Sequence, residues 1–333
     1  MGGNLFSTKR VSRETYFKVA EEVLRAFAPC GEMSLVPCVG DKQDFGDIDI
    51  VCRFDAGVAR SYIKETLPAH EISVNDGVVS FGWVIASCDA KLQVDLICRP
   101  NNFEDALAYR SYGDFGHISG SIYDYNGLSL GDTGLLFKVG TNKAGQKSFR
   151  ICSFVEALPF IGISESTWRA GFDTEEDMFK SFVDSGYLPF VKFMEASGRI
   201  DSTGAYVSDK KEDDYERPAL KRFSDYLWTH SSKFSLSYQT QPKEVDYQAL
   251  ADKFGDKWMR DAERHQIHSD TIALFRDHVN GETVSAATGL TGKELGDVMK
   301  KISAYSWIVE RAANEGYDPI AAVFAHLIRK HEL

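Results

Sequence analysis

Two aspartates have the spacing that carboxylates need to act together. Asp47 and Asp49 are separated by Ile48 within the stretch 47–52, whose other residues are apolar. Because side chains alternate between the two faces of a strand, both carboxylates lie on one face and the opposite face belongs to the core. Neighbouring carboxylates repel each other and are costly to bury without a cation. The pattern therefore predicts a site for a hard divalent cation such as Mg²⁺, whose remaining ligands are phosphate oxygens and water.

A third aspartate lies in a second apolar stretch, 92–98. Asp95 shares a face there with Gln93, and the other side chains are apolar. A lone carboxylate in such a run is costly unless a nearby group compensates its charge, and the same metal ions would do so. The alternative is a structural role, in which Asp95 caps a turn or pairs with Lys91 or Arg99.

The three acids and a glycine-bounded loop together resemble the catalytic core of the polymerase-beta nucleotidyltransferase superfamily, in a phage-type form. The superfamily pattern is a Gly-Ser turn, an Asp-x-Asp pair and a third acid on a later strand. Here Gly40 begins the loop, Gly46 precedes the pair, and Asp95 supplies the third acid, so that the resemblance covers about residues 11–100. It implies that Asp47, Asp49 and Asp95 are the catalytic and metal-binding residues, with Mg²⁺ or Mn²⁺ as the cofactor.

The resemblance also implies a reaction. A hydroxyl attacks the α-phosphorus of a nucleoside triphosphate and pyrophosphate leaves, while two metal ions about 3.5–4 Å apart stabilise the attacking and leaving oxygens. Asp47 and Asp49 would bridge both ions. Asp95 would hold the ion that activates the attacking hydroxyl and would accept its proton.

The loop before the Asp-x-Asp pair departs from the superfamily at one position, because Asp41 stands where a serine is usual. Gly40 and Gly46 would let the backbone approach the triphosphate closely. Lys42, or the backbone N–H groups of the loop, would replace the phosphate contact of the serine. The predicted nucleotide-binding residues are therefore Gly40, Asp41, Lys42 and Gly46, with ATP among the expected nucleotides.

The periodicity of apolar residues predicts an α+β fold. Ser12 is placed to cap the first helix and Thr174 a later one. We expect helices at 12–28, 56–66 and 101–112, strands at 33–39, 47–52, 71–75, 78–85 and 91–98, and a loop at 113–117. Beyond this region we expect helices at 174–182, 218–230, 247–266, 268–279, 293–304 and 317–331. The expected domains are a small mixed-sheet nucleotidyltransferase domain at 1–155 and a mostly α-helical, acceptor-handling domain at 156–333.

A segment of the second half is similar to the helical part of CCA-adding enzymes and bacterial poly(A) polymerases. Within 280–299 the pattern is Asn-Gly, then Gly-Leu-Thr-Gly, then Leu-Gly. Its physical sense is a tight turn at Gly292, a helix from Lys293 and close backbone approach at Gly296. The stretch 168–176 resembles the midsection of phage-encoded nucleotidyltransferases. The acidic-arginine template that selects C and A in CCA-adding enzymes is not found, which leaves the choice of nucleotide open.

Two groups of lysines are candidates for RNA binding. The first surrounds an expected turn at 141–145 and fits either a phosphate-facing patch or a solvated hairpin tip. The second lies in the helix after Gly292, whose first N–H groups suit an RNA phosphate, unless the glycines serve only close helix packing. The first group is Lys138, Lys143 and Lys147, with Arg150 beside them, and the second is Lys293 and Lys300.

Bulk composition limits the choice of partner and compartment. The formal net charge of −11 disfavours a protein that grips nucleic acid over its whole surface, so a polyanion must meet a local basic patch or the substrate is small. The six cysteines form no C-x-x-C pair, which predicts free thiols in a reducing cytoplasm. No apolar run approaches the roughly 18 residues of a membrane span.

The sequence is consistent with three functions. The favoured one is metal-dependent transfer of a nucleotide to an RNA 3′ end, with tRNA as one candidate, which would place the chain in RNA processing. The second is nucleotidyl transfer to a protein or a small molecule, of the toxin or antibiotic type, which suits the acidic net charge better. The third is an inactive nucleotidyltransferase fold that binds nucleic acid, an alternative motivated by Asp41 in the serine position.

Overall fold

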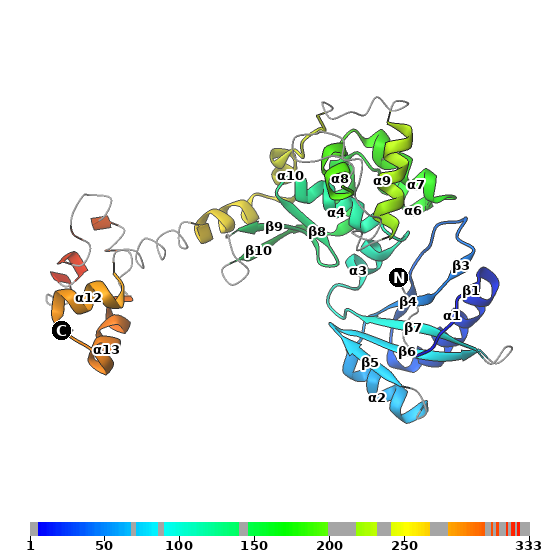
Figure 1. Cartoon of the computed structure of the whole chain (residues 1–333), viewed down its shortest axis with the longest axis horizontal. Coiled ribbons are helices and arrows are strands. Elements are labelled where there is room, and N and C mark those ends of the chain that lie inside the picture. The colour runs from blue at the N-terminus through cyan, green and yellow to red at the C-terminus, as the bar shows by residue number, and fades with distance from the viewer. Residues whose placement is uncertain are drawn as a thin grey trace. The chain divides into compact units, whose positions relative to one another are not determined.

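The computed structural model describes residues 6–67, 71–85, 90–139, 146–198, 218–231, 241–266 and 279–303, with short pieces between 308 and 326. The chain forms two compact units, the first comprising residues 1–137 and 150–255, the second residues 138–149 and 256–333. The predicted α+β class is confirmed, since a mixed five-stranded sheet near the N-terminus is followed by a largely helical region (Figure 1). Among the described residues, no helix is both long and apolar enough to span a bilayer.

One pair of adjacent strands in the five-stranded sheet runs parallel, and the other pairs are antiparallel. The sheet has the order β2-β4-β7-β6-β5, and only the β4–β7 pair is parallel. Its strands are β2 (Met33–Leu35), β4 (Asp47–Cys52), β7 (Ala90–Cys98), β6 (Val78–Ile85) and β5 (Ile72–Asn75), and a separate two-stranded sheet pairs β1 (Val11–Ser12) with β3 (Asp44–Phe45). The predicted strand at 33–39 is too long. Val36 N–H still donates to the Asp49 carbonyl at 3.0 Å, and Pro37, which has no N–H, ends the ladder there.

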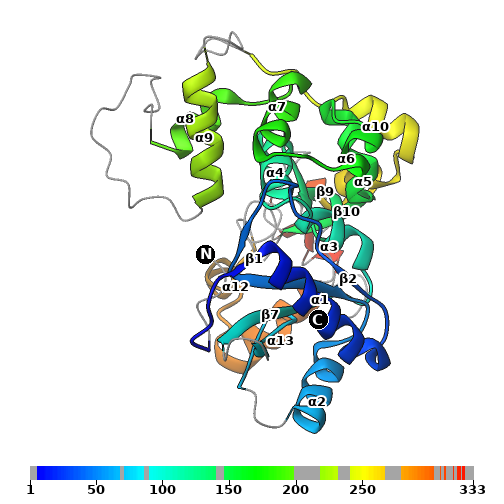
Figure 2. The same cartoon turned by 90° about the vertical axis from the view of Figure 1, so that its right-hand side faces the viewer.

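Two helices cover one face of this sheet. Ser12 caps α1 (Arg13–Phe27) by accepting from Thr15 N–H, and the 3₁₀ turn η1 (Ala28–Cys30) follows the helix. Ile48 and Ile50 pack with buried residues of α1 and of α2 (Ala56–Thr66) in one apolar cluster. The alternation expected for 47–52 is therefore confirmed, and Figure 2 shows α1 lying along the sheet.

The opposite face of the sheet has a smaller apolar cluster. Val51 and Ile97 pack there against Phe103 and Ala106 of α3 (Phe103–Arg110). Two residues before Val51 and Ile97, on the same strands and the same face, are Asp49 and Asp95. The acidic residues therefore share their face of the sheet with α3.

A helical group with aromatic contacts follows the sheet within the first unit. The ring centroids of Phe115 and Phe182 lie 4.9 Å apart, and Phe223 lies 5.0 Å from both Phe179 and Phe193. These contacts join α4, α7, α8 and α9. The elements of this region are α4 (Phe115–Tyr125), β8 (Leu128–Gly131), β9 (Gly134–Val139), β10 (Lys147–Cys152), α5 (Phe154–Ala157), η2 (Leu158–Ile161), α6 (Glu165–Ala170), α7 (Glu175–Ser185), α8 (Phe190–Ala196), α9 (Pro218–His230) and α10 (Tyr247–Phe254), and β10, β9 and β8 form a three-stranded sheet in that order.

Four expectations for the region beyond residue 112 either need correction or fall outside the described residues. The stretch 113–117 is not a loop throughout, because Phe115 is buried and begins α4, and only the preceding residues make the turn. The helix expected at 247–266 is interrupted at Gly255, whose φ of +80° a helix cannot accommodate, and a second helical stretch occupies 257–266. Residues 268–278 and most of 317–331 lie outside the described part of the chain.

The second unit contains a pair of consecutive helices. Asn280 caps α12 (Gly281–Thr288) by accepting from two backbone N–H groups, and α13 (Gly292–Ser303) follows after a short turn. Val284, Val298 and Ile302 belong to their shared apolar core. Of the cysteines, Cys30, Cys38, Cys52, Cys98 and Cys152 are free thiols, while Cys88 lies outside the described residues.

Candidate metal centre

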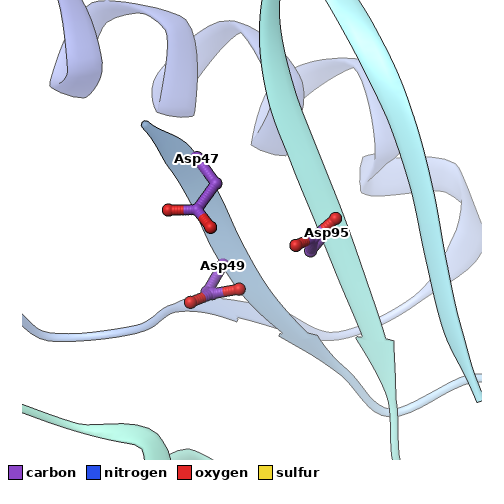
Figure 3. A group of neighbouring side chains, drawn as sticks. All are labelled: Asp47, Asp49 and Asp95. Atoms are coloured by element: carbon purple, nitrogen blue, oxygen red, sulfur yellow. The ribbon is translucent and has the colours of Figure 1, made fainter. Parts of the chain in front are cut away.

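Three carboxylates converge on the face of the sheet that carries α3. Asp47 and Asp49 project from β4, and Asp95 projects from β7 on the same side (Figure 3). The parallel register places Asp49 directly beside Asp95. One carboxylate oxygen from each residue lies within 4.8 Å of those from the other two. Two positions of a strand and one of its neighbour thus bring together the three acids that the sequence predicted as a group.

The donor set fits a hard divalent cation. Oxygens that bind one Mg²⁺ at about 2.1 Å lie about 3 Å apart when adjacent and about 4.2 Å apart when opposite. The three aspartate oxygens are within 4.8 Å of one another, so small side-chain rotations bring them into that range. Each residue is half-buried, which leaves room for ligands from outside the protein. The site can therefore hold a divalent cation through carboxylate oxygens.

The electrostatics of the site favour a bound cation. Burial raises the pKa of Asp49 to about 7, with the charges of Asp47 and Asp95 acting in the same direction, and Arg110 and Lys42 oppose the shift. Burial also raises the pKa of Asp95, and hydrogen bonds from Ser80 and Gln93 oppose it. A divalent ion would relieve the repulsion that makes the ionised carboxylates costly.

Asp95 is held by hydrogen bonds and not by Arg99. Gln93 Nε2 lies 3.0 Å from both carboxylate oxygens of Asp95. The Arg99 side chain instead donates to Asp132 at 3.0 Å and to the Asp76 carbonyl at 2.9 Å. The structural alternative in which Arg99 pairs with Asp95 is therefore wrong. The amide of Gln93 fixes the orientation of the carboxylate while leaving lone pairs for a metal.

The loop before β4 is anchored against a distant segment. Gly40 N–H donates to the Phe172 carbonyl at 2.9 Å, and a Cβ at Gly40 would lie 2.7 Å from the Asp173 carbonyl oxygen. Asp41 is exposed, whereas Gly46 is buried. Lys42 Nζ lies 4.7 Å from the centre of the Phe45 ring, and its charge reaches Asp49. Gly40 is thus required for a close backbone approach within the chain.

Two arginines near the site were not predicted from the sequence. Arg13, on α1, donates to the Lys42 carbonyl at 2.9 Å and so supports the loop. Arg110 ends α3 and opposes the pKa shifts of both Asp49 and Asp95. Neither belongs to a short motif with the acids. The one available sequence signal was the helix expected at 101–112, which puts Arg110 in its last turn.

A cavity of about 360 Å³ adjoins this loop. It lies entirely within the first unit, and its charged lining includes three cationic and four acidic side chains. Two of its cations are already paired, Arg10 with Asp44 and Arg222 with Glu175 at 2.8 Å. The lining residues are Arg10, Cys38, Val39, Asp41, Lys42, Asp44, Tyr112, Gly113, Asp114, Glu175 and Arg222.

The lysines predicted to contact RNA have different surroundings. Lys138, Lys147, Lys293 and Lys300 are exposed, and Lys143 lies outside the described residues. Arg150, beside the first group, pairs with the buried Asp105 at 2.6 Å.

The two glycines of α13 do not serve close packing within the described residues. At Gly296 a Cβ would meet no described atom within 4 Å, so no close approach to a described residue requires this glycine. Gly292 has a φ of +57°, a left-handed conformation that favours glycine, and the turn that precedes α13 requires it.

The mixed sheet with its parallel pair and three aspartates is compatible with the nucleotidyltransferase fold that the sequence resembles. No protein-family model matches this chain, and no curated protein matches it either.

Proposed function

We propose that this chain is a metal-dependent nucleotidyltransferase, which transfers a nucleoside monophosphate from a nucleoside triphosphate to a hydroxyl at an RNA 3′ end. The observation that supports it is the convergence of Asp47, Asp49 and Asp95 from two parallel strands. Bound Mg²⁺ or Mn²⁺ would neutralise the triphosphate and lower the pKa of the attacking hydroxyl.

Each acid has its own part in this proposal. Asp47 and Asp49, adjacent on one strand face, hold the cations, while the neighbouring loop with Lys42 faces the phosphates. Asp95, oriented by Gln93, receives the proton of the acceptor hydroxyl. The catalytic residues belong to the proposed domain at 1–155, and the acceptor is assigned to the helical domain at 156–333.

The distribution of charge supports contact between a nucleic-acid acceptor and the second unit. The ranges of the second unit contain thirteen lysines and arginines and twelve aspartates and glutamates, a formal charge of +1. Because the whole chain has a formal charge of −11, the rest of the chain carries −12. A polyanion meets less repulsion at the second unit, which contains Lys293 and Lys300.

Transfer of label tests the proposal directly. The protein is incubated with each α-³²P-labelled nucleoside triphosphate, Mg²⁺ or Mn²⁺, total RNA and total protein, and Asp49→Asn serves as the matched control. Label in RNA that requires metal and is lost in the variant is the expected result. Label in protein or in a small molecule instead would show that the acceptor is a protein or a small molecule and not RNA. No label above the variant in any fraction would overturn the proposed activity.

A further inference from the structure

The guanidinium of Arg110 is poised for an anion that the described chain does not supply. Its Nε is buried and has no hydrogen-bond partner, and no ion pair joins its side chain to a described residue. A guanidinium carries five N–H donors in a planar fork that matches carboxylate and phosphate oxygens. A buried donor without a partner is costly, so this arrangement points to a ligand.

The position of Arg110 relates it to the metal centre. α3 packs on the acidic face of the sheet through Phe103 and Ala106, and Arg110 is its last residue. Two residues later, Tyr112 N–H donates to the Pro37 carbonyl at 2.7 Å, which fixes the end of α3 against the chain that enters the loop at Gly40.

The turn after Arg110 is also strained. Tyr112 has a φ of +61°, and Gly113 follows with a φ of +68°. A left-handed conformation is unfavourable for a bulky residue and is retained where the surroundings impose it. Both residues line the cavity that adjoins the loop, and they follow directly after the helix end whose Arg110 charge reaches Asp49 and Asp95.

A direct ion pair does not account for Arg110. Its charge acts on Asp49 and Asp95, but no salt bridge joins it to either carboxylate. Three carboxylates and a triphosphate carry more negative charge than two divalent ions neutralise. Additional positive charge is therefore needed beside the phosphates, and a planar fork that is not already paired can supply it.

We propose that Arg110 binds the β- and γ-phosphates of the triphosphate, the part that leaves as pyrophosphate. This inference rests on the proposed nucleotidyl transfer. Lys42, held over the Phe45 ring, provides a second positive charge that acts on Asp49. Arg110 thereby orients the leaving group without touching the acceptor.

Binding measurements separate this inference from the activity itself. Dissociation constants are measured for a nucleoside triphosphate with a methylene in place of the α,β-bridging oxygen, for pyrophosphate and for the nucleoside monophosphate, all with Mg²⁺. The variants are Arg110→Gln and Arg110→Lys, and Arg60→Gln on the exposed surface of α2 is the matched control. Mn²⁺ affinity without nucleotide is measured in parallel, and thermal melting confirms that each variant folds.

Arg110→Gln is expected to weaken binding of the triphosphate analogue and of pyrophosphate about ten- to a hundredfold, the loss typical of a charged hydrogen bond. Monophosphate affinity should change by less than about twofold, and Mn²⁺ affinity without nucleotide should not fall, because Arg110→Gln removes a positive charge that acts on Asp49 and Asp95. Arg110→Lys should restore part of the loss because it keeps the charge without the fork. Unchanged pyrophosphate binding, or an equal loss for monophosphate, overturns the inference. If wild-type protein binds the analogue but transfers no label, the proposed activity fails while this inference is still tested, and if wild-type binds neither analogue nor pyrophosphate, both fail.

Discussion

At the scale of single residues, Asp49 shows how burial and repulsion combine at the metal centre. Its folded-state pKa of about 7 lies above the ordinary value of 3.8. The metal-free folded protein therefore holds a proton there that the unfolded chain releases, between about pH 4 and pH 7. The contribution of Asp49 to stability is present below this window and is lost as the pH rises through it.

Substitution of Asp49 should remove this pH dependence. In EDTA, we expect the melting temperature of Asp49→Asn, relative to wild type, to increase as the pH rises from about 4 to about 7 and to level off above. Thermal melts of both proteins in the same buffers provide the comparison. A difference that stays constant over this range would contradict a pKa of Asp49 that is raised by burial and by the charges of Asp47 and Asp95.

Asp41 should tolerate replacement by the residue that the superfamily uses. Its side chain is exposed and lines the cavity next to Lys42, so Asp41→Ser removes a negative charge near the expected phosphates. We expect Asp41→Ser to retain or lower the KM for nucleotide and Lys42→Ala to raise it, both measured in the label-transfer assay. Loss of transfer in Asp41→Ser would instead make Asp41 a participant in metal binding or proton transfer.

The sequence predicted the three acids because each is identified by the residues next to it in its own strand. Alternation along a strand places Asp47 and Asp49 on one face, and the cost of a lone acid in an apolar run singles out Asp95. Arg13 and Arg110 were not found. Their relevance depends on how α1 and α3 pack against the sheet, and neither residue type nor spacing encodes that packing.

At the scale of elements, the loop before β4 depends on a glycine. Gly40→Ala would place its Cβ 2.7 Å from the Asp173 carbonyl oxygen, whereas a Cβ at Gly57 in α2 would meet no described atom within 4 Å. We expect Gly40→Ala to lower the free energy of unfolding by about 1–3 kcal/mol and to raise the KM for nucleotide. Gly57→Ala should raise stability by up to about 1 kcal/mol without changing KM.

Chemical denaturation of both variants, with nucleotide titrations, checks this pair. If Gly40→Ala were as stable and as active as Gly57→Ala, the loop would not be held against the segment at Asp173. Both substitutions add one methyl group, so the comparison isolates the contact from the effect of replacing glycine.

Strong periodicity predicted several elements to the residue. The strands at 47–52 and 78–85 and the helices at 56–66 and 218–230 agree with the structure. The loop expected at 113–117 failed because burial of Phe115 outweighed the local glycines. The helix expected at 247–266 failed at Gly255, whose positive φ no amphipathic pattern reveals.

At the scale of the whole molecule, the uneven charge of the two units leads to a prediction about salt. Lys293→Ala combined with Lys300→Ala should weaken RNA binding and flatten its dependence on salt, because phosphate contacts release counterions. The nucleotide KM should not change. Lys18→Ala combined with Lys64→Ala, exposed lysines of the first unit, is the matched control. Equal salt slopes for the two double variants would remove the support for RNA contact at α13.

The central claim is that Asp47, Asp49 and Asp95 together bind the catalytic divalent ions. Titration of Mn²⁺ into wild type, Asp47→Asn and Asp49→Asn, with free Mn²⁺ followed by electron paramagnetic resonance, measures this directly in the presence of the methylene triphosphate analogue. We expect saturable binding in wild type and a loss of affinity of at least about tenfold in each variant, as removal of a charged ligand implies. Binding of Mn²⁺ that is the same in wild type and both variants, or no saturable binding in wild type, would contradict the claim.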